Sequence, residues 1–363
     1  MNGYDRFFLS HSRDMQHWCV RDRQNMQRDH WPRVVEALAI GAVIRRSPDD
    51  FRVDEELPFA PCGTGEHAWL KVRKRCRETQ FVAKILARHA GVRLRDVSYA
   101  GLKDKYALTT QWFSVYLPGR PMPDWAAVAD DGVEVLCATR HTRKLKRGAL
   151  RANRFIIIAR ELGASSGTLT AHLARIAQDG VPNYFGEQRF GTDNLEKAQA
   201  MLTGRLRVRD RFLRGFYFSV LRAWLFNTVL AHRVQAGCWN RAVPGEVLGL
   251  AGSRSYFPAP ALDPALLARV AENDLHPTGP LWGRGGNPAA GRALALEQEA
   301  LAPHGQWCTA LERAGVAMGR RPLRLVPEGL TWRTLAEGAA EMRFTLPPGA
   351  YATALLREAL HLR

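Results

Sequence analysis

Strand-like and helix-like patterns follow one another in the first half of the chain without strict alternation. A helix is predicted over 79–90, where apolar residues recur at helical spacing between Thr79 as cap and Gly91 as stop. Strands are predicted from alternating or β-branched runs around 43–44, 51–55, 68–72, 97–100, 111–117 and 156–159. Because a doubly wound parallel sheet needs strands and helices in turn, this order favours an α+β fold with a mixed or largely antiparallel sheet.

One carboxylate, Asp104, stands alone among small residues and lysines between two of these predicted strands. Gly101 allows the tight backbone that would carry Asp104 to a surface. Lys103 and Lys105 favour its charged form and attract anionic ligands such as an RNA backbone. Composition alone favours a lysine-flanked aspartate on a solvated hairpin loop, with a catalytic aspartate as the alternative.

The charge of the chain points to a polyanionic partner. Its 363 residues, enough for two domains or for one large domain with an insertion, carry a formal net charge of +17. Nucleic acid is a better candidate than a membrane, since no apolar run is long enough to span a bilayer. An arginine-rich composition that reflects a GC-rich genome would explain part of this excess. The six cysteines are scattered, without Cys-x-x-Cys pairs, which predicts reduced thiols, a cytoplasmic protein and no structural zinc.

The densest basic run covers residues 140–155. Asn153 adds an amide that can bond a base edge, and Phe155 adds a ring on which a base can stack. A basic run is more often just a solvated surface, but the predicted strand 156–159 joins this one to a core. Such a cluster would neutralise several phosphates. The side chains predicted here to contact an RNA backbone are Arg143, Lys144, Lys146, Arg147 and Arg151.

Several motifs resemble those of the TruD family of pseudouridine synthases. Gly-Leu-Lys-Asp-Lys-Tyr-Ala-Leu-Thr at 101–109 matches the family's Gly-x-Lys-Asp-x-x-Ala-x-Thr run, whose Asp is the nucleophile. The other matches are the Asp-Phe-x-Val-x-Glu context of Phe51, the Lys-Leu-x-x-Gly-x-Leu-x-Ala-Asn-x-Phe run at 144–155, the Asn-Tyr-Phe-Gly-Glu-Gln-Arg-Phe-Gly run at 183–191 and the Leu-Pro-x-Gly-x-Tyr-Ala-Thr-x-x-x-Arg-Glu ending at 346–358. Two positions depart from the family pattern, Ala152 where Gly is usual and Tyr351 where many members carry Phe.

This resemblance, which extends from Trp31 to Glu358, implies a domain organisation. It implies a pseudouridine synthase-type catalytic domain over 31–179 and 326–363, interrupted by a family-specific inserted TRUD domain of α/β type over 180–325. Residues 1–30 are expected to be a disordered extension or the product of an upstream start codon. In the later part of the chain, helices are predicted over about 168–178 and 216–234 and from about 193 and 351, with a strand over 340–346.

The resemblance also implies the site and its chemistry. Asp104 would be the nucleophile, Phe51 would lie against the base, Asn153 and Phe155 would contact the target nucleotide, and Tyr351 would line the pocket. The implied substrate is transfer RNA, at uridine 13 of the D arm. No cofactor, metal, membrane or protein partner is expected, and the protein is expected to be a monomer.

Two other functions compete with this one. The first is a basic RNA-binding or ribosome-assembly factor without chemistry, for which Asp104 would be dispensable. The second is a phosphoryl-transfer nuclease, which needs clustered carboxylates for two metal ions. Its candidate ligands are Asp49, Asp50, Asp54 and Glu55, but alternation along a strand would turn them away from one another.

Overall fold

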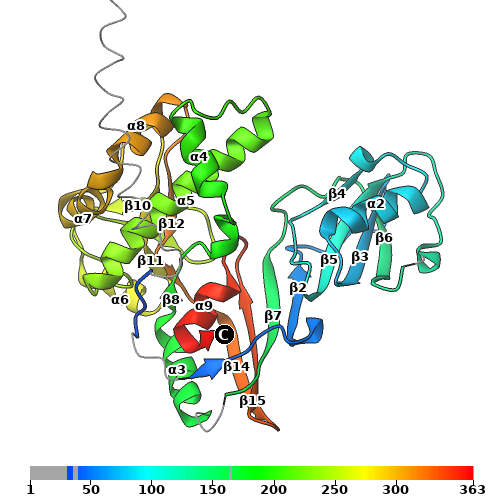
Figure 1. The fold of residues 1–363 in the computed structure, drawn as a ribbon, viewed down its shortest axis with the longest axis horizontal. Helices are drawn as coiled ribbons and strands as arrows, with labels where there is room; N and C mark the ends of the chain where they lie inside the picture. The colour runs from blue at the N-terminus through cyan, green and yellow to red at the C-terminus, as the bar shows by residue number, and fades with distance from the viewer. Residues whose placement is uncertain (1–30, 36–39, 129, 163–165, 363) are drawn as a thin grey trace, which may run out of the picture.

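The computed structural model describes residues 31–35, 40–128, 130–162 and 166–362, so the predicted extension 1–30 lies outside the described residues. Its main feature is an eight-stranded sheet in the order β14-β15-β7-β2-β5-β3-β6, with β4 paired to β5 (Figure 1). Among the described strands of this sheet, β2 and β5 are the one pair that runs in parallel, so the sheet is mixed, as predicted. The strands are β2 (Phe51–Glu56), β3 (His67–Arg75), β4 (Val97–Tyr99), β5 (Leu108–Tyr116), β6 (Val133–His141), β7 (Ala152–Ala159), β14 (Glu328–Leu335) and β15 (Ala339–Leu346).

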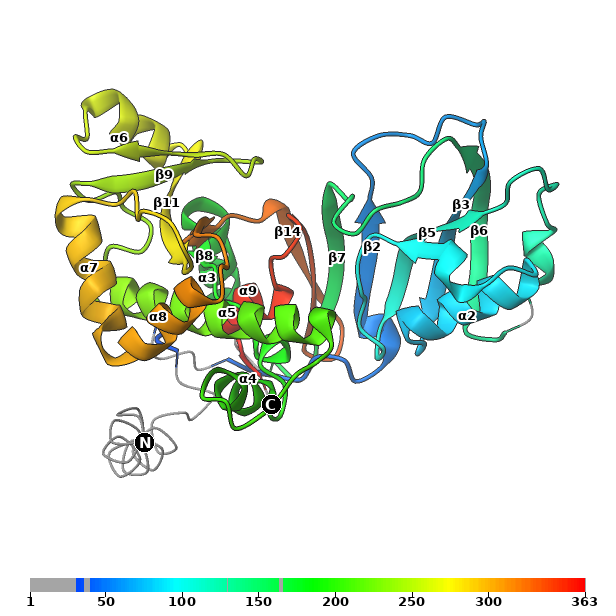
Figure 2. The same cartoon turned by 90° about the horizontal axis from the view of Figure 1, so that it is seen from above.

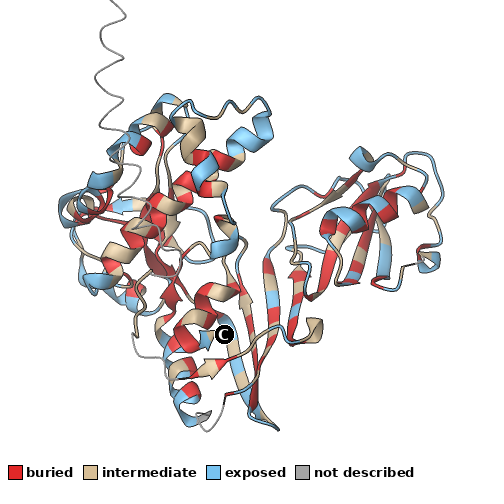
Figure 3. Cartoon of the chain, viewed as in Figure 1, coloured by how far each residue is buried: buried red, intermediate tan, exposed pale blue. Residues whose placement is uncertain are grey.

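Separate helices cover the two halves of this sheet. Helix α2 (Thr79–His89) packs its Val82 and Leu86 on β3 and β5, and buried residues dominate these strands (Figure 3). Helices α3 (Ser166–Asp179) and α9 (Ala352–Ala359) pack on β7 and β15 and form a second core. The sheet therefore connects two hydrophobic cores, and the β2–β5 pair lies at the boundary between them.

Residues 180–325 form a separate group of helices around a small antiparallel sheet (Figure 2). The long helix α5 (Arg211–Gln235) runs through the group and is buried along one side. Two ion pairs, Arg233–Glu246 at 2.7 Å and Arg320–Glu297 at 2.6 Å, are buried there. The other elements are α4 (Asn194–Leu202), α6 (Pro264–Ala271), α7 (Gly291–Leu301), α8 (Gly305–Arg313), β9 (Glu246–Leu250), β10 (Tyr256–Ala259), β11 (Leu275–Leu281) and β12 (Gly319–Pro322).

The chain enters and leaves this group at the same place. Strand β8 (Val181–Pro182) pairs antiparallel with β13 (Arg324–Leu325). Near the ends of the described chain, β1 (Gly41–Ala42) pairs in parallel with β16 (His361–Leu362). Within the described ranges, no helix combines the length and the hydrophobicity needed to cross a membrane.

One predicted helix cap and one predicted helix start were wrong. Helix α2 starts at Thr79, as predicted, but Glu78 occupies its N-cap position without a side-chain cap hydrogen bond, and the Thr79 side chain is buried. Helix α5 begins five residues before the predicted 216, because the apolar residues of its first turn, Phe212 and Leu213, are exposed and are not part of the buried side used for the prediction. Asp210 caps α5 by accepting a hydrogen bond from the Leu213 amide at 2.7 Å.

Candidate active site

Asp104 lies on the loop that joins β4 to β5. The loop is fixed at both ends, because Ala100 and Ala107 are buried. In addition, the Gly148 amide donates to the Ala100 carbonyl oxygen at 2.7 Å, which ties this loop to the basic run. The hairpin predicted around Asp104 is therefore present, and the start of its loop is held against the basic run.

Two buried side chains hold the main chain of this loop. The Gln111 amide nitrogen on β5 donates to the Gly101 carbonyl oxygen, and the Thr79 hydroxyl accepts from the Lys103 amide at 3.0 Å. Thr79 also donates to Gln111 Oε1 at 3.1 Å, so the two side chains form one network. A buried polar group that loses its partner costs about 1–3 kcal/mol, so this network strongly favours one conformation of the loop.

A third buried side chain, Lys74, reaches the main chain at the aspartate itself. Its ammonium donates to the Asp104 carbonyl oxygen at 2.6 Å, and the residue is 0% exposed. Burial lowers the pKa of Lys74 to about 8, against the opposing effect of the Asp104 charge. We call Lys74, Thr79 and Gln111 the loop clamp.

The Asp104 carboxylate itself is partly open to solvent, with 24% of the side chain exposed. Arg45 Nη2 donates to Oδ2 at 2.7 Å, and Gln188 Nε2 donates to Oδ1 at 2.9 Å. Arg45 precedes β2 and Gln188 lies within 183–191, so three distant parts of the chain meet at this carboxylate. Both donors form their bonds near solvent, where an incoming ligand can replace them.

Of the two lysines beside Asp104, Lys103 does not lie as predicted. Lys103 donates to Glu55 in an ion pair and has only 9% of its side chain exposed, so it does not face an RNA backbone. Lys105 is exposed and lies 3.7 Å from Glu78. The direct partner of the carboxylate is Arg45, because the Lys103 ammonium is drawn to the fully buried Glu55 instead.

Phe51 and Phe155 do not form a sandwich in this structure. They pack edge to face with ring centroids 6.2 Å apart, and Phe155 stacks on Phe344 at 5.3 Å. Alternation along β2 and β7 turns both rings into the core, where Phe51 is 2% exposed. The Arg45 guanidinium carbon lies 4.0 Å from the centre of the Phe51 ring. Phe51 is thus linked to Asp104 through Arg45.

Asn153 presents an unused hydrogen-bond acceptor. It lies on β7 between its register partners Glu55 on β2 and Leu346 on β15. Its Oδ1 atom is buried and accepts no hydrogen bond from any residue in the described ranges. Since buried acceptors are normally paired, this atom is a candidate acceptor for an N–H group of a ligand.

Tyr351 lies directly before α9 and packs against the segment that also carries Gln188. Its ring centroid is 6.1 Å from that of Phe185. A Cβ atom at Gly186 would lie 3.0 Å from Tyr351 Cδ1 and 2.9 Å from Thr353 Oγ1. The absence of a side chain at Gly186 therefore lets Tyr351 pack here, and the run 183–191 connects Tyr351 to Asp104.

Replacing Gly186 by alanine is expected to reduce turnover by about tenfold, because the added methyl displaces Tyr351 and, with it, the run that carries Gln188. Gly186 has an ordinary φ of −71°, so alanine introduces a steric change without backbone strain. Gly167→Ala is the matched control, since a Cβ there meets nothing within 4 Å. Equal turnover of the two variants in single-turnover assays would contradict the role of this contact.

The basic run forms an exposed loop around one buried anchor. Leu145 is buried, and its amide donates to Ser114 Oγ at 3.0 Å. Its neighbours Arg143, Lys144, Lys146 and Arg147 are exposed. Arg151 is also exposed, but it donates to both carboxylate oxygens of Glu328 at 3.0 and 3.1 Å.

Besides Thr79 and Gln111, three side chains at the site were not predicted from the sequence as functional. Lys74 had a usable signal, since it stands in phase with the buried Ala68, Leu70 and Val72 on β3, where a charged residue is unusual. Gln188 lies in a motif that was recognised without a role for its amide. Arg45 carried no such signal, because it reaches Asp104 from outside any predicted element, with φ at 60°.

Three of the four carboxylates named as candidate nuclease ligands are held in separate ion pairs. Asp49 pairs with Arg75 at 2.5 Å, and Asp50 pairs with Arg160 at 2.7 Å. Glu55 pairs with Lys103, as described above. Within the described part of the chain, no three metal-binding side chains gather at one point. This arrangement does not favour a two-metal site.

A family model described as tRNA pseudouridine synthase D (TruD) matches residues 32–207 and 193–359. A curated protein named tRNA pseudouridine synthase D from Nitrosococcus oceani is 49% identical over 321 residues, which cover 87% of this chain and 90% of that protein. A protein of the same name from Methylococcus capsulatus is 48% identical over 332 residues, covering 91% and 94% of the two chains.

A solved structure from Methanosarcina mazei, described as a TruD protein, has the same fold. It superposes with a TM-score of 0.69 and covers 91% of this chain and 95% of that chain. At 21% identity, this likeness concerns the fold alone.

Proposed function

Because the chain belongs to the TruD family of tRNA pseudouridine synthases, we propose that it isomerises a uridine of transfer RNA, at position 13 of the D arm, to pseudouridine. The observation that carries this proposal is the exposure of the Asp104 carboxylate on a firmly held main chain. The aspartate at the family's nucleophile position has a solvent-accessible carboxylate on a main chain held by the loop clamp. A solvated aspartate of no function would not need such support.

In this proposal Asp104 is the nucleophile and acts where ribose joins uracil. The reaction breaks the bond between C1′ and N1, turns the freed base and joins C1′ to C5. N1 gains a proton and C5 loses one, so substrate and product are isomers and no group donor or oxidant is consumed. A covalent step through Asp104 would divide one difficult rearrangement into two easier ones. When the nucleotide reaches the Asp104 carboxylate, it replaces some of the hydrogen bonds that Arg45 and Gln188 donate to that group.

Residues around Asp104 would receive the base after it leaves the RNA stack. When Arg45 moves off the face of Phe51, the uracil can take its place against that ring. Phe155 supports Phe51 through their edge-to-face contact. The free Oδ1 of Asn153 suits the N3–H donor of uracil, and Tyr351 closes the pocket beside Phe185.

We propose the same division into domains that the sequence predicts, with residues 31–179 and 326–363 as the catalytic domain and 180–325 as an insertion. The pairing of β8 with β13 supports it, because the two ends of the insertion lie side by side. The exposed side chains that would contact RNA phosphates directly are Arg143, Lys144, Lys146 and Arg147. Lys105 and Arg151 would also bind phosphates, after these replace the carboxylates of Glu78 and Glu328 as their partners. The protein would act as a monomer in the cytoplasm.

The test uses an unmodified transfer RNA transcript and mapping of pseudouridine by carbodiimide-dependent stops of reverse transcription. We expect a new stop that reports modification of nucleotide 13 and that is absent from a transcript with cytidine at this position. Modification at another uridine would overturn the choice of nucleotide. Tight binding without any modification would favour the RNA-binding factor instead of the enzyme.

A further inference from the structure

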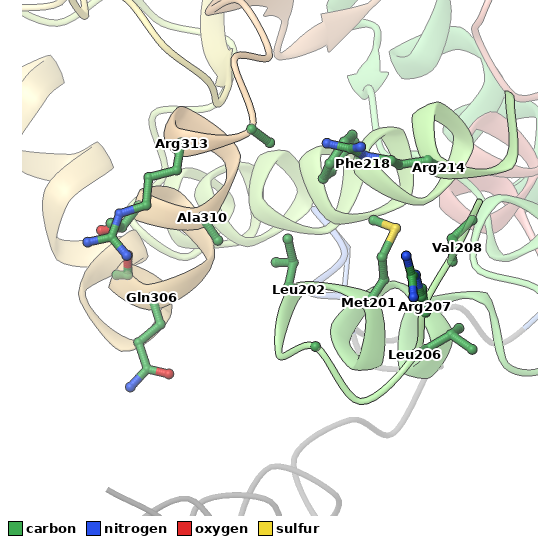
Figure 4. Close-up of a pocket in the computed structure, with 14 residues that line it drawn as sticks. Met201, Leu202, Leu206, Arg207, Val208, Arg214, Phe218, Gln306, Ala310 and Arg313 are labelled. Atoms are coloured by element: carbon green, nitrogen blue, oxygen red, sulfur yellow. The ribbon is translucent and has the colours of Figure 1, made fainter. Parts of the chain in front are cut away.

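A second hollow, remote in sequence from Asp104, lies in the group formed by residues 180–325. It has a volume of about 840 Å³ and is bounded by α4, α8 and the segment between α4 and α5, with α5 behind it (Figure 4). Its apolar lining includes Met201, Leu202 and Phe218, and its basic lining consists of Arg207, Arg214 and Arg313. We call it the arginine hollow.

The three arginines of the hollow are available for an anionic ligand. All three are exposed, and no carboxylate is among the residues that line the hollow. In the ranges that the structure describes, none of them forms an ion pair with an acidic side chain. Elsewhere in the same group the half-buried Arg269 and the exposed Arg292 do pair, with Asp274 and Glu299.

The local sequence explains why the arginines face outward. In the run Arg-Leu-Arg-Val-Arg at 205–209, Leu206 and Val208 pack on the core around α5, whereas the arginines between them are exposed. Arg313 approaches from the opposite wall, on α8 (Figure 4). Two segments about a hundred residues apart thus place guanidinium groups around one partly apolar space.

The hollow is connected to the basic loop beside the candidate active site. Phe212, at the start of α5, is exposed, and its ring centre lies 5.3 Å from the Arg147 guanidinium carbon. Arg214, two residues farther along α5, already lines the hollow. The basic loop and the hollow therefore both border the first turn of α5, although residues two apart on a helix do not share a face.

We propose that the arginine hollow binds a nucleotide of the same transfer RNA, outside the segment that is presented to Asp104. Its phosphate would lie on the guanidinium groups of Arg207 and Arg313, while its sugar or base would contact Met201 and Phe218. Unpaired arginines around a partly apolar surface suit a nucleotide better than an apolar protein segment. This inference rests on the proposed function, since it assigns a second contact to the same substrate.

The test measures transfer RNA binding and turnover by Arg207→Gln/Arg313→Gln. We expect the dissociation constant to rise about tenfold and the slope of log affinity against log salt to decrease by about 1–2, because two phosphate contacts are lost. The rate under saturating RNA is expected to remain within about twofold, since neither residue touches Asp104. Arg269→Gln/Arg292→Gln removes the same charge from solvent-accessible, ion-paired arginines outside the hollow and is expected to leave the affinity near the wild-type value.

An isolated D-arm hairpin separates this inference from the proposed function. We expect the wild-type protein and the Arg207→Gln/Arg313→Gln variant to bind the hairpin equally, because it lacks the distant nucleotide. Equal loss of affinity by the variant for hairpin and full transfer RNA would overturn the inference, as would unchanged affinity for full transfer RNA. If the wild-type protein modifies no uridine at all, the proposed function fails. Even then, a loss of affinity by the variant for full transfer RNA but not for the hairpin would support the inference that the hollow binds RNA.

Discussion

Asp104→Asn is expected to reduce pseudouridine formation by about 10⁴-fold or more, because asparagine cannot supply the ionised oxygen that the covalent step requires. The amide is nearly isosteric, and one of its heteroatoms can still meet Gln188. The main-chain contacts of the loop clamp do not involve the carboxylate, so the fold of the loop should be retained. Single-turnover conversion of a transcript, followed by carbodiimide-dependent stops, measures the effect.

Asp96→Asn is a matched control for this loss of charge. Asp96 has the same side-chain exposure as Asp104, 24%, and lies just before β4, where it pairs with Arg93. We expect it to keep wild-type turnover. Both variants should bind transfer RNA about as tightly as the wild type, which separates loss of chemistry from loss of binding. Turnover by Asp104→Asn at the wild-type rate would show that this aspartate is not the nucleophile.

The fold class was predictable because its local signals agree with one another. The spacing of apolar residues located α2 and β15 to within one or two residues, and the irregular order of elements excluded a doubly wound sheet. The order of strands was not predictable in the same way. The pairing of β2 with both β5 and β7 joins segments about 57 and 100 residues apart, which no local pattern encodes.

The site was predictable only where the chemistry is local in sequence. Asp104 could be selected because its motif surrounds it, but the groups that bind it could not. Lys103 was the expected partner of Asp104 because it is adjacent in sequence. In the folded chain Lys103 pairs with the buried Glu55, and the partner of Asp104 is Arg45, 59 residues away. Phe51 and Phe155 illustrate the same limit. A strand aromatic can face a ligand or a core, and that choice depends on the partners of the strand.

Replacing Lys74 by methionine is expected to reduce the turnover number about 100-fold while the Michaelis constant changes less than about threefold. Lys74 does not reach the substrate in our proposal; it positions Asp104 through the main-chain oxygen. Without this bond, the Asp104 carboxylate can move out of the position that the reaction needs. This reduces the rate of the chemical step, whereas the contacts with RNA are unaffected. Lys71→Met, on the same strand with its side chain on the opposite face, is the matched control and should retain turnover.

Stability measurements on Lys74→Met distinguish positioning from simple unfolding. Burial lowers the pKa of Lys74 from its ordinary 10.5 to about 8, so between these pH values the unfolded chain binds a proton that the native protein does not. The unfolding free energy of the wild type should therefore rise relative to that of the variant by about 3 kcal/mol from pH 8 to 10.5, and should show no such trend below pH 8. At neutral pH the lost hydrogen bond, about 1–3 kcal/mol, is offset by removal of a buried charge, so both proteins should be similarly stable. Parallel stability curves would mean that Lys74 is not buried as described, and a variant that turns over normally would mean that Asp104 does not need the clamp.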